Sequence, residues 1–250
     1  MRNTTAKLSG LNRRINCQNQ SRNKEILRTL GTKKKSRQFW NRCFEDAKWD
    51  YKTLANKNWS DFINKLKRLK VKKVLDLGCG YGTWSIVMAR AGFKVRAVDI
   101  SKRALGILKE WANEEKLFIK TQICSAQKFK SKEKFDAIIC NSVLDHMVFN
   151  DTKIAINRIR YILSPKGIAY FSFDGPSEDK KDKKGFILLD DGTRYYIKGK
   201  FKGMLWRYYT DEEIKILCKN LKIIEFRVRK HGRRYVWMKK KPRFSLAMQG

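Results

Sequence analysis

The stretch VLDLGCGYGTW, residues 74–84, decides the fold of this chain. A short apolar run contains an acid at Asp76, and glycines then follow at every second position up to residue 82. The next segment, TWSIVMARAG (83–92), has helical spacing and ends at a glycine, as helices often do. Strand, glycine-rich loop and helix in this order predict the first unit of a parallel sheet. Glycine has no Cβ, so a ligand can lie against this loop.

The alternation of strand and helix continues over the next hundred residues. Ser101 is placed to cap one helix and Asp151 another. Strands that alternate with helices indicate a Rossmann-like doubly wound α/β sheet with right-handed crossovers. The last segment, 221–240, reads as two antiparallel strands joined by a tight turn at His231-Gly232. The intervening strands are expected at KVRAVDI (94–100), FIKTQIC (118–124), KFDAIIC (134–140) and IAYFSF (168–173).

Composition divides the chain into three parts. Residues 1–38 carry eleven basic residues and one acid, which predicts a mobile basic N-terminal arm. Residues 39–70 are rich in aromatic residues at helical spacing and are expected to form two helices that cap the rest. The segment 71–250 then forms the main domain. An insertion at 174–209, with a hairpin at Asp191-Gly192, is expected to serve as a lid or substrate region.

The net charge of +34 has two explanations. A compositional bias toward lysine accounts for much of it, whereas a polyanionic partner such as RNA would account for the shortage of acids. The 6 cysteines are scattered and no run of about 18 apolar residues occurs, so neither a zinc site nor a membrane span is expected. We expect a cytoplasmic protein, or an organellar one if residues 1–38 are a transit peptide.

The residues around the glycine loop specify its ligand. Asp99 ends the second strand nineteen residues after Gly80, where a carboxylate can accept both hydroxyls of a ribose. Thr83 occupies the position at which a dinucleotide fingerprint requires glycine or alanine, and no Gly-Lys-Ser/Thr follows. Asp76 would repel a pyrophosphate. These residues favour an adenosine-like ligand that carries an amino group and a positive sulfur.

Four segments together resemble the successive motifs of class I S-adenosylmethionine-dependent methyltransferases. They are VLDLGCGYG, VRAVDIS, FDAIICNSVLDHM and RYILSPKGIAYFSF, and the resemblance extends over about residues 50–240. It is strongest to the small-molecule branch, in which a helical N-terminal segment and a late insertion cover the pocket. The resemblance implies S-adenosyl-L-methionine as the cofactor.

The resemblance also implies roles for individual residues. Asp76 would lie near the methionine amino group, Asp99 would hold the ribose hydroxyls and Ile100 would pack on the adenine. The family often has an acid after the third strand, where this chain has Ala126 and Gln127 instead. The full set of expected cofactor contacts is Asp76, Gly78, Cys79, Gly80, Gly82, Asp99, Ile100, Ala126, Gln127 and Asn141.

Methyl transfer from a sulfonium needs little acid–base help, because the leaving group is neutral; positioning supplies most of the rate. A base is needed only when the acceptor must lose a proton. His146, just past the fourth strand, is either that base, a substrate contact or a residue that fixes the loop. Candidate substrate contacts are Trp40, Tyr51, Tyr81 and Tyr208, although aromatic residues at helical spacing also suit core packing.

Several acceptors are disfavoured. The fourth strand is followed by Asn141-Ser142-Val143-Leu144 rather than the Pro-Pro-Tyr/Phe pattern of enzymes that methylate base amines. No cysteine follows a proline, which disfavours cytosine C5 methylation. Only Asp145 supplies an acid near this strand, so no catalytic metal is expected. We therefore expect methyl transfer to a small molecule. The alternatives are an RNA methyltransferase that uses the basic arm and C-terminal strands, and a non-catalytic RNA-binding protein of the same fold.

Overall fold

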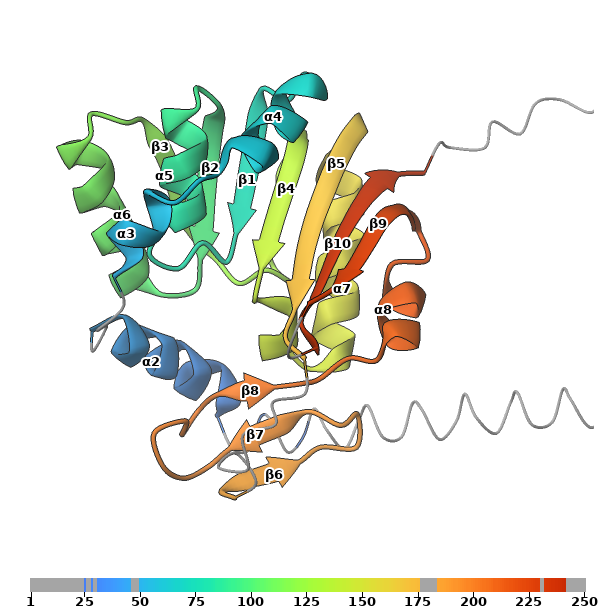
Figure 1. Cartoon of the computed structure of the whole chain (residues 1–250). Helices are drawn as coiled ribbons and strands as arrows, with labels where there is room; N and C mark the ends of the chain where they lie inside the picture. The colour runs from blue at the N-terminus through green and yellow to red at the C-terminus, as the bar shows by residue number, and fades with distance from the viewer. Residues whose placement is uncertain are drawn as a thin grey trace, which may run out of the picture.

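The computed structural model describes residues 25, 28, 31–45, 50–175, 184–229 and 232–241. Seven strands form one sheet in the order β3-β2-β1-β4-β5-β10-β9 (Figure 1). The first five are parallel to one another, and β10 pairs antiparallel with both β5 and β9. The predicted α/β sheet with an antiparallel C-terminal strand pair is confirmed. The strands are β1 (Lys73–Leu77), β2 (Lys94–Asp99), β3 (Ile119–Ile123), β4 (Phe135–Asn141), β5 (Leu163–Phe173), β9 (Leu221–Val228) and β10 (Arg234–Lys240).

Helices cover both faces of the sheet. The helices α4 (Ser60–Arg68), α5 (Thr83–Arg90) and α6 (Lys102–Glu114) pack on one face, against residues such as Val74, Ala97 and Ile139. The helices α7 (Phe149–Ile162) and α8 (Asp211–Leu217) pack on the other face, against Leu75 and Ile138. Alternate residues of β1 and β4 thus enter different cores, because successive side chains of a strand point to opposite faces.

The strand order places a switch point beside the glycine loop. From β1 the chain moves outward to β2 and β3, and it then returns to the other side of β1 to form β4 and β5. The loops after β1 and β4 therefore leave the sheet side by side in opposite directions. Ligands of open α/β sheets bind at this position, outside the carboxyl ends of the strands.

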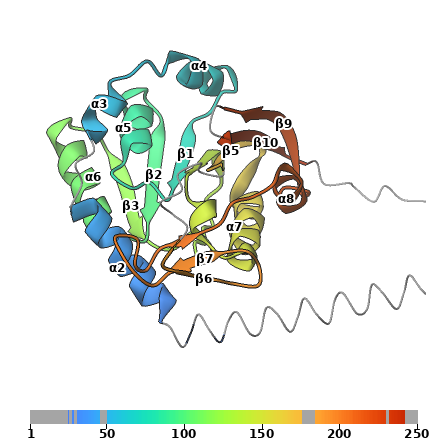
Figure 2. The same ribbon diagram turned by 60° about the horizontal axis from the view of Figure 1, so that its bottom comes forward.

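The N-terminal boundary drawn from composition falls inside a helix. Helix α2 (Thr32–Glu45) includes the last seven residues of the segment expected to be a mobile arm, and it lies across the C-terminal ends of the parallel strands (Figures 1 and 2). Its first turn is rich in lysine, which hid it, although Thr32, Ser36 and Phe39 are buried. With α3 (Tyr51–Ala55) and α4, the described part of this region contains three helices rather than two, and α4 packs on the face of the sheet. Residues 1–24 lie outside the described residues.

The insertion forms a small sheet of its own. Strands β6 (Phe186–Leu188), β7 (Arg194–Tyr196) and β8 (Leu205–Trp206) lie beside α2 at the same edge of the main sheet (Figure 2). The predicted hairpin with its turn at Asp191-Gly192 is confirmed. The turn predicted at His231-Gly232 falls partly outside the described residues, since His231 is one of those not described.

One capping prediction is correct and one is not. Ser101 Oγ accepts a hydrogen bond from the Ala104 amide and caps α6, as expected. Helix α7 begins at Phe149, two residues before Asp151, which therefore lies inside the first turn. Its carboxylate instead accepts a hydrogen bond from Gln127 Nε2 at 3.0 Å. The Asp151 side chain, which the local pattern predicts as the cap of α7, thus makes a tertiary contact with Gln127 instead.

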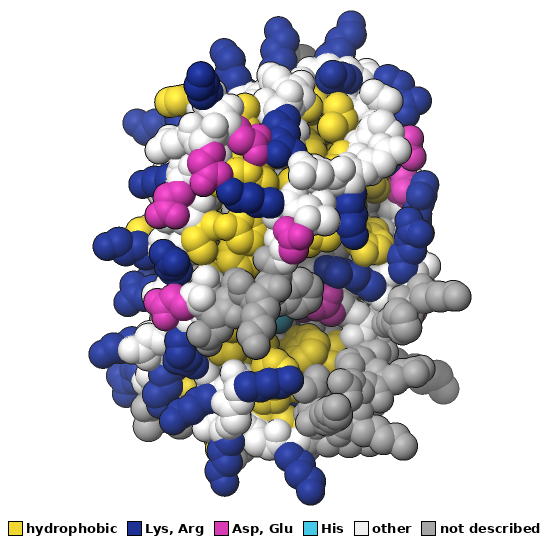
Figure 3. Space-filling view, turned by 60° about the vertical axis from the view of Figure 1, so that its left-hand side comes forward, with side chains coloured by type: hydrophobic (Ala, Val, Ile, Leu, Met, Phe, Trp, Pro, Cys, Tyr) yellow, Lys and Arg dark blue, Asp and Glu magenta, His cyan; other side chains and the backbone are white. Residues whose placement is uncertain are grey.

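Positive charge is widely distributed over the surface. Figure 3 shows lysine and arginine side chains from the top to the bottom of the visible face, with acidic side chains between them. Among the described helices, none is long and apolar enough to cross a membrane.

Candidate functional site

The glycine loop is held against the end of β2. The amides of Gly78 and Cys79 both donate to the Val98 carbonyl, at 2.6 and 3.1 Å. One oxygen of Asp99 accepts from the Gly80 amide at 2.9 Å and the other from the Ser101 amide at 2.8 Å. The first expected cofactor residues are therefore brought together, and the loop backbone fixes the orientation of the Asp99 carboxylate.

Two carboxylates are buried side by side behind this loop. Asp76 is 2% exposed and Asp99 is 6% exposed. Burial, reinforced by the charge of Asp99, raises the pKa of Asp76 to about 7, although a 2.6 Å hydrogen bond from Ser85 Oγ opposes the shift. Burial likewise raises the pKa of Asp99, against hydrogen bonds from the Ser101 and Gly80 amides.

The charge of this pair is uncompensated. Within the described part of the chain, neither carboxylate forms an ion pair with a lysine or arginine. Buried charges are normally paired, so a positively charged ligand is the chemical group that this position lacks. The site thus fits a ligand with an ammonium or sulfonium group and a hydroxylated ribose.

The glycines serve the packing of the protein as much as any ligand. A Cβ on Gly78 would lie 2.3 Å from Val143, and a Cβ on Gly82 would lie 2.2 Å from Leu108 of α6. Gly80 is different, because its Cβ would meet the Phe44 ring of α2 at 3.3 Å. All three glycines were expected to contact the cofactor. Gly78 and Gly82 also allow Val143, just after β4, and Leu108 of α6 to pack closely against the loop.

The remaining expected cofactor residues differ in their surroundings. Cys79 and Ala126 are each 8% exposed and belong to the two hydrophobic cores. Ile100 is half-buried at the end of β2. Gln127 is held by its hydrogen bond to Asp151. For Cys79 and Ala126, the backbone rather than the side chain is therefore the part available to a ligand.

The end of β4 carries a polar network. Asn141 Oδ1 accepts from Ser172 Oγ at 2.9 Å, and Ser172 Oγ accepts from the Ser142 amide at 2.8 Å. Arg233 donates to Ser142 Oγ and lies 3.3 Å from Asp174 Oδ1. Strands β4, β5 and β10 therefore meet here through side chains. Sequence analysis predicted only Asn141 of this group.

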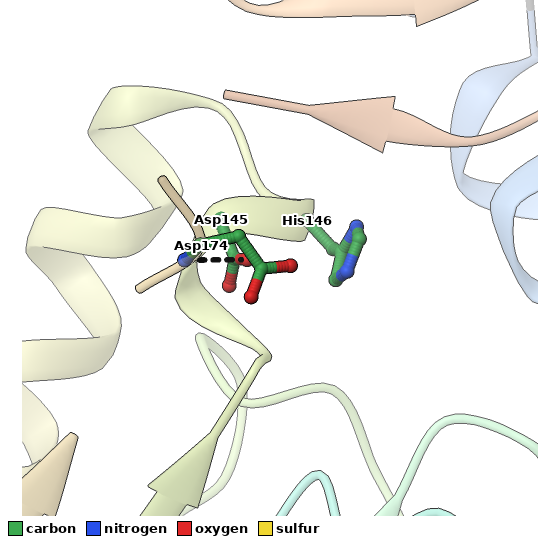
Figure 4. A group of neighbouring side chains, drawn as sticks. All are labelled: Asp145, His146 and Asp174. Atoms are coloured by element: carbon green, nitrogen blue, oxygen red, sulfur yellow. Dashed lines mark hydrogen bonds between the residues drawn. The ribbon is translucent and has the colours of Figure 1, made fainter. Parts of the chain in front are cut away.

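His146 lies next to that network, in the short 3-10 helix Leu144–His146 (Figure 4). Its Nδ1 is 3.1 Å from the Leu205 carbonyl of β8. A carbonyl only accepts hydrogen bonds, so Nδ1 carries the proton and Nε2 keeps its lone pair. Burial lowers the pKa of His146, although the Leu205 carbonyl and the Asp174 charge oppose this. The neutral imidazole is thus the form at pH 7.

Two acids stand beside His146. The Asp174 carboxylate faces the imidazole, and the Asp174 amide donates to Asp145 Oδ2 at 3.3 Å (Figure 4). Asp145 is fully buried and its Oδ1 has no hydrogen-bond partner among the described residues. Burial, and next the Asp174 charge, raise the pKa of Asp145 well above its ordinary value.

These three residues bear on the expectation that no metal binds. Ligand atoms of Asp145, His146 and Asp174 lie within 4.8 Å of one another, a set of donors that a divalent cation accepts. The sequence places only Asp145 close to the fourth strand, because Asp174 comes from the end of a different strand. The Arg233 guanidinium already pairs with Asp174, and its positive charge opposes a cation there.

Aromatic rings form a wall that extends from the glycine loop to the small sheet. Tyr51 stacks on Tyr81 with centroids 4.7 Å apart, Tyr81 meets Phe44 at 4.6 Å, and Phe44 lies 6.1 Å from Trp40. Trp40 packs edge-on against His146 at 4.8 Å.

The wall then continues into the insertion. His146 lies 6.4 Å from Trp206, which meets Tyr208 at 5.3 Å. We call the seven residues Tyr51, Tyr81, Phe44, Trp40, His146, Trp206 and Tyr208 the aromatic wall. It contains all four expected substrate contacts and joins the helical cap to the insertion.

The wall also contains two residues that sequence analysis did not single out. Phe44 and Trp206 belong to helix and strand patterns that read as core. Trp206 Nε1 is buried without a hydrogen-bond partner among the described residues, and an indole N–H normally has one. Only the tertiary structure reveals this free donor. Tyr51 also contacts Trp111 at 5.3 Å, so it serves the core as well.

Known proteins resemble this chain in sequence. Residues 74–167 match the model of a methyltransferase domain. A ubiquinone biosynthesis O-methyltransferase of Pasteurella multocida is 30% identical over 172 residues, which cover 63% of this chain and 68% of the relative. The corresponding protein of Pelagibacter ubique is 32% identical over 132 residues, or 53% of this chain. The match spans only about half, 52%, of that relative's length.

Solved structures share the fold. An S-adenosylmethionine-dependent methyltransferase from Clostridium acetobutylicum aligns with a TM-score of 0.61 and 18% identity, over 78% of this chain and 94% of that one. The magnesium protoporphyrin IX methyltransferase of Synechocystis, with bound S-adenosylhomocysteine, aligns with a TM-score of 0.58 and 18% identity, over 82% of this chain and 94% of that one. The glycine loop, the buried acid pair, the sequences of the relatives and the fold of these structures agree. The chain belongs to the class I S-adenosylmethionine-dependent methyltransferases.

Proposed function

We propose that this protein methylates a hydroxyl oxygen of a small aromatic molecule, with His146 as the general base. One observation carries the proposal. The Nδ1–H group of His146 donates a hydrogen bond to the Leu205 carbonyl, which leaves Nε2 with a lone pair that can accept a proton. A hydroxyl group is a poor nucleophile until it loses its proton, and a neutral imidazole is suited to take it at pH 7.

The residues around the glycine loop would hold the cofactor. The Asp99 carboxylate is oriented by two backbone amides and has further lone pairs for ribose hydroxyls. Asp76 would offer the negative charge that the amino acid part of the cofactor needs. When bound, S-adenosylmethionine supplies an activated methyl group. Gly80, beneath Phe44, allows the close approach that a side chain would prevent.

The proton balance at His146 is simple. The acceptor's O–H proton moves to Nε2, while the other proton stays bound to Nδ1, which keeps its hydrogen bond to the Leu205 carbonyl. The imidazolium that forms faces the Asp174 carboxylate, which stabilises the positive charge (Figure 4). The electron pair of the O–H bond remains on the oxygen, which becomes the nucleophile. Asp174 is thus a positioning residue, held in turn by Arg233.

The aromatic wall supports a planar acceptor. Rings on both sides of His146 would stack on an aromatic substrate and exclude water. The free Trp206 Nε1 would donate to an oxygen of the substrate. The matched relatives from Pasteurella and Pelagibacter carry the name ubiquinone biosynthesis O-methyltransferase, which agrees with an oxygen acceptor. An RNA substrate is less favoured, because the names of these relatives and of the magnesium protoporphyrin IX methyltransferase point to small-molecule acceptors.

A series of substituted phenols tests the proposal. We expect His146→Gln to lower kcat by about 10² to 10⁴ with phenols whose pKa is well above the assay pH. The loss should shrink sharply with nitrophenols, which are already ionised and need no base. S-adenosylhomocysteine affinity, measured by calorimetry, should not change. An equal loss across the whole series would show that His146 has a structural role only.

Trp206→Phe provides a matched test of the wall. This change keeps an aromatic ring but removes the N–H donor, so we expect KM to rise more for acceptors with a second oxygen than for plain phenol. If the parent binds S-adenosylhomocysteine but methylates no compound in a broad screen of hydroxylated aromatics, the non-catalytic alternative gains instead.

A further inference from the structure

The edge of the sheet opposite the candidate site contains a cavity of about 480 Å³. It lies where β1, β2, β3 and β4 begin, at the upper ends of these strands in Figure 1. Its volume lies within the range of small-molecule pockets. Its base is apolar and includes Phe93, Leu117 and Phe135. The reaction proposed above makes no use of this cavity.

The side chains at the rim of the cavity are mostly positive. Lys73 and Arg96 both pair with Glu133, at 3.1 and 3.2 Å, so one acid serves two bases. Lys94, Lys116 and Lys120 also line the cavity and are exposed, and no ion pair to any described residue neutralises them. The rim therefore has an excess of positive charge, which suits an anionic ligand.

An exposed aromatic ring stands among these lysines. Phe118 lines the cavity and is 80% exposed, more than any other exposed large hydrophobic residue of the described chain. It lies between Lys116 and Lys120 in the sequence. An exposed ring flanked by cations is a surface on which a nucleobase stacks while its phosphates meet the charges.

The unpaired lysines continue past the cavity. Those that precede or begin the first four parallel strands form what we call the basic edge: Lys70, Lys72, Lys94, Lys116, Lys120, Lys130 and Lys132, all exposed. With neighbouring strands about 4.8 Å apart, the basic edge extends over about 14 Å from β3 to β4. A single phosphate group cannot reach all of these charges, whereas the successive phosphates of a nucleic-acid strand can.

We propose that the basic edge and the Phe118 cavity bind single-stranded nucleic acid, with one base on Phe118 and the phosphates on the lysines. A double helix is excluded as the main ligand, because its stacked bases cannot reach Phe118. The site lies at the edge opposite His146 and the cofactor residues, so the inference does not depend on the proposed reaction. In this proposal the single-stranded nucleic acid is a bound partner and not the methyl acceptor.

Fluorescence anisotropy with a labelled single-stranded RNA of about twelve nucleotides tests the inference. The triple variant Lys94→Gln, Lys116→Gln, Lys120→Gln removes three charges from the cavity. We expect the slope of log Kd against log salt to fall by about 2, from about 0.7 per lost phosphate contact. The matched control Lys109→Gln, Lys153→Gln, Lys215→Gln removes three exposed helical charges elsewhere and should leave the slope unchanged.

Phe118→Ala tests the stacking contact separately. We expect at least about a fivefold loss of affinity with little change of the salt slope. Unchanged S-adenosylhomocysteine binding and an unchanged thermal midpoint would show that each variant folds. Equal effects of the two lysine triples, equal binding of duplex RNA, full competition by AMP at equal phosphate concentration, or no binding by the parent at low salt would each overturn the proposal.

Discussion

At the scale of single residues, Asp76 links the cofactor site to stability. Its pKa of about 7 in the folded protein exceeds the ordinary value of 3.8. Below about pH 4 the Asp76 carboxyl is neutral in both the folded and the unfolded protein, so it does not affect the free energy of unfolding. As the pH rises to 7, the carboxyl ionises in the unfolded chain but stays largely protonated in the folded protein, and the free energy of unfolding falls. The loss is at most roughly 4 kcal/mol.

Asp76→Asn should abolish this pH dependence. We expect the variant without cofactor to be more stable than the parent at pH 8, equally stable near pH 4, and poor at binding S-adenosylhomocysteine. Urea unfolding between pH 4 and pH 8 measures the effect, with exposed Asp61→Asn as the control. A lower stability than the parent at pH 8 would mean that the buried carboxylate is well solvated or paired.

The protonation of His146 predicts the acid limb of the activity profile. A base must be neutral to act, so kcat/KM should fall as the pH drops through the pKa of His146, which burial lowers below 6.5. Arg233→Gln removes a positive charge that lowers this pKa and leaves Asp174 unpaired. Both changes raise the pKa of His146, so we expect the acid limb to move to higher pH. If the acid limb of the kcat/KM profile of Arg233→Gln lies at the same pH as in the parent, this electrostatic coupling is contradicted.

At the scale of elements, α2 is the part of the fold that closes the site. Ser101 Oγ donates to Asn41 Oδ1 at 2.6 Å, Tyr81 Oη donates to the Cys43 carbonyl at 3.2 Å, and Arg42 reaches the Lys202 carbonyl at 2.9 Å. The helix thus connects the glycine loop to the insertion. It also carries Trp40 and Phe44 of the aromatic wall.

Gln38→Pro should therefore weaken cofactor binding from a distance. Gln38 is exposed in the middle of α2, and proline there costs about 3 kcal/mol or more by breaking the helix. We expect S-adenosylhomocysteine affinity to fall about tenfold or more, while Gln38→Ala, which favours the helix, leaves it unchanged. Calorimetry and far-UV circular dichroism measure the two effects. Full affinity with a broken α2 would show that the helix does not close the site.

At the scale of the whole molecule, charge repulsion should govern the response to salt. A net charge of +34 opposes the compact state through the mutual repulsion of like charges. Raising NaCl from about 0.05 to about 0.5 M shortens the screening length to a few ångströms and should raise the thermal midpoint by several degrees. Differential scanning fluorimetry of the full chain measures this shift. A flat or falling midpoint would mean that attractive ion pairs dominate instead.

Short-range patterns in the sequence were sufficient for the sheet and for half of the site. Asp76 and Asp99 were predicted because each stands at a strand end whose position the strand–helix alternation shows. Gly80 follows for the same reason. The start of α2 was missed, because its lysine-rich first turn lacks the apolar spacing that a core-facing helix normally shows, and its buried Thr32 and Ser36 are polar.

The chemistry around His146 was beyond reach of the sequence. Asp174, Arg233 and Leu205 come from segments 28, 87 and 59 residues away from His146 along the chain. They meet only because β5 and β10 are neighbours and β8 returns over the site. The sequence by itself determined the fold class and the cofactor loop, since both depend on local periodicity. The tertiary structure alone decided the tautomer of His146, the aromatic wall and the free Trp206 donor, because each depends on contacts between distant segments.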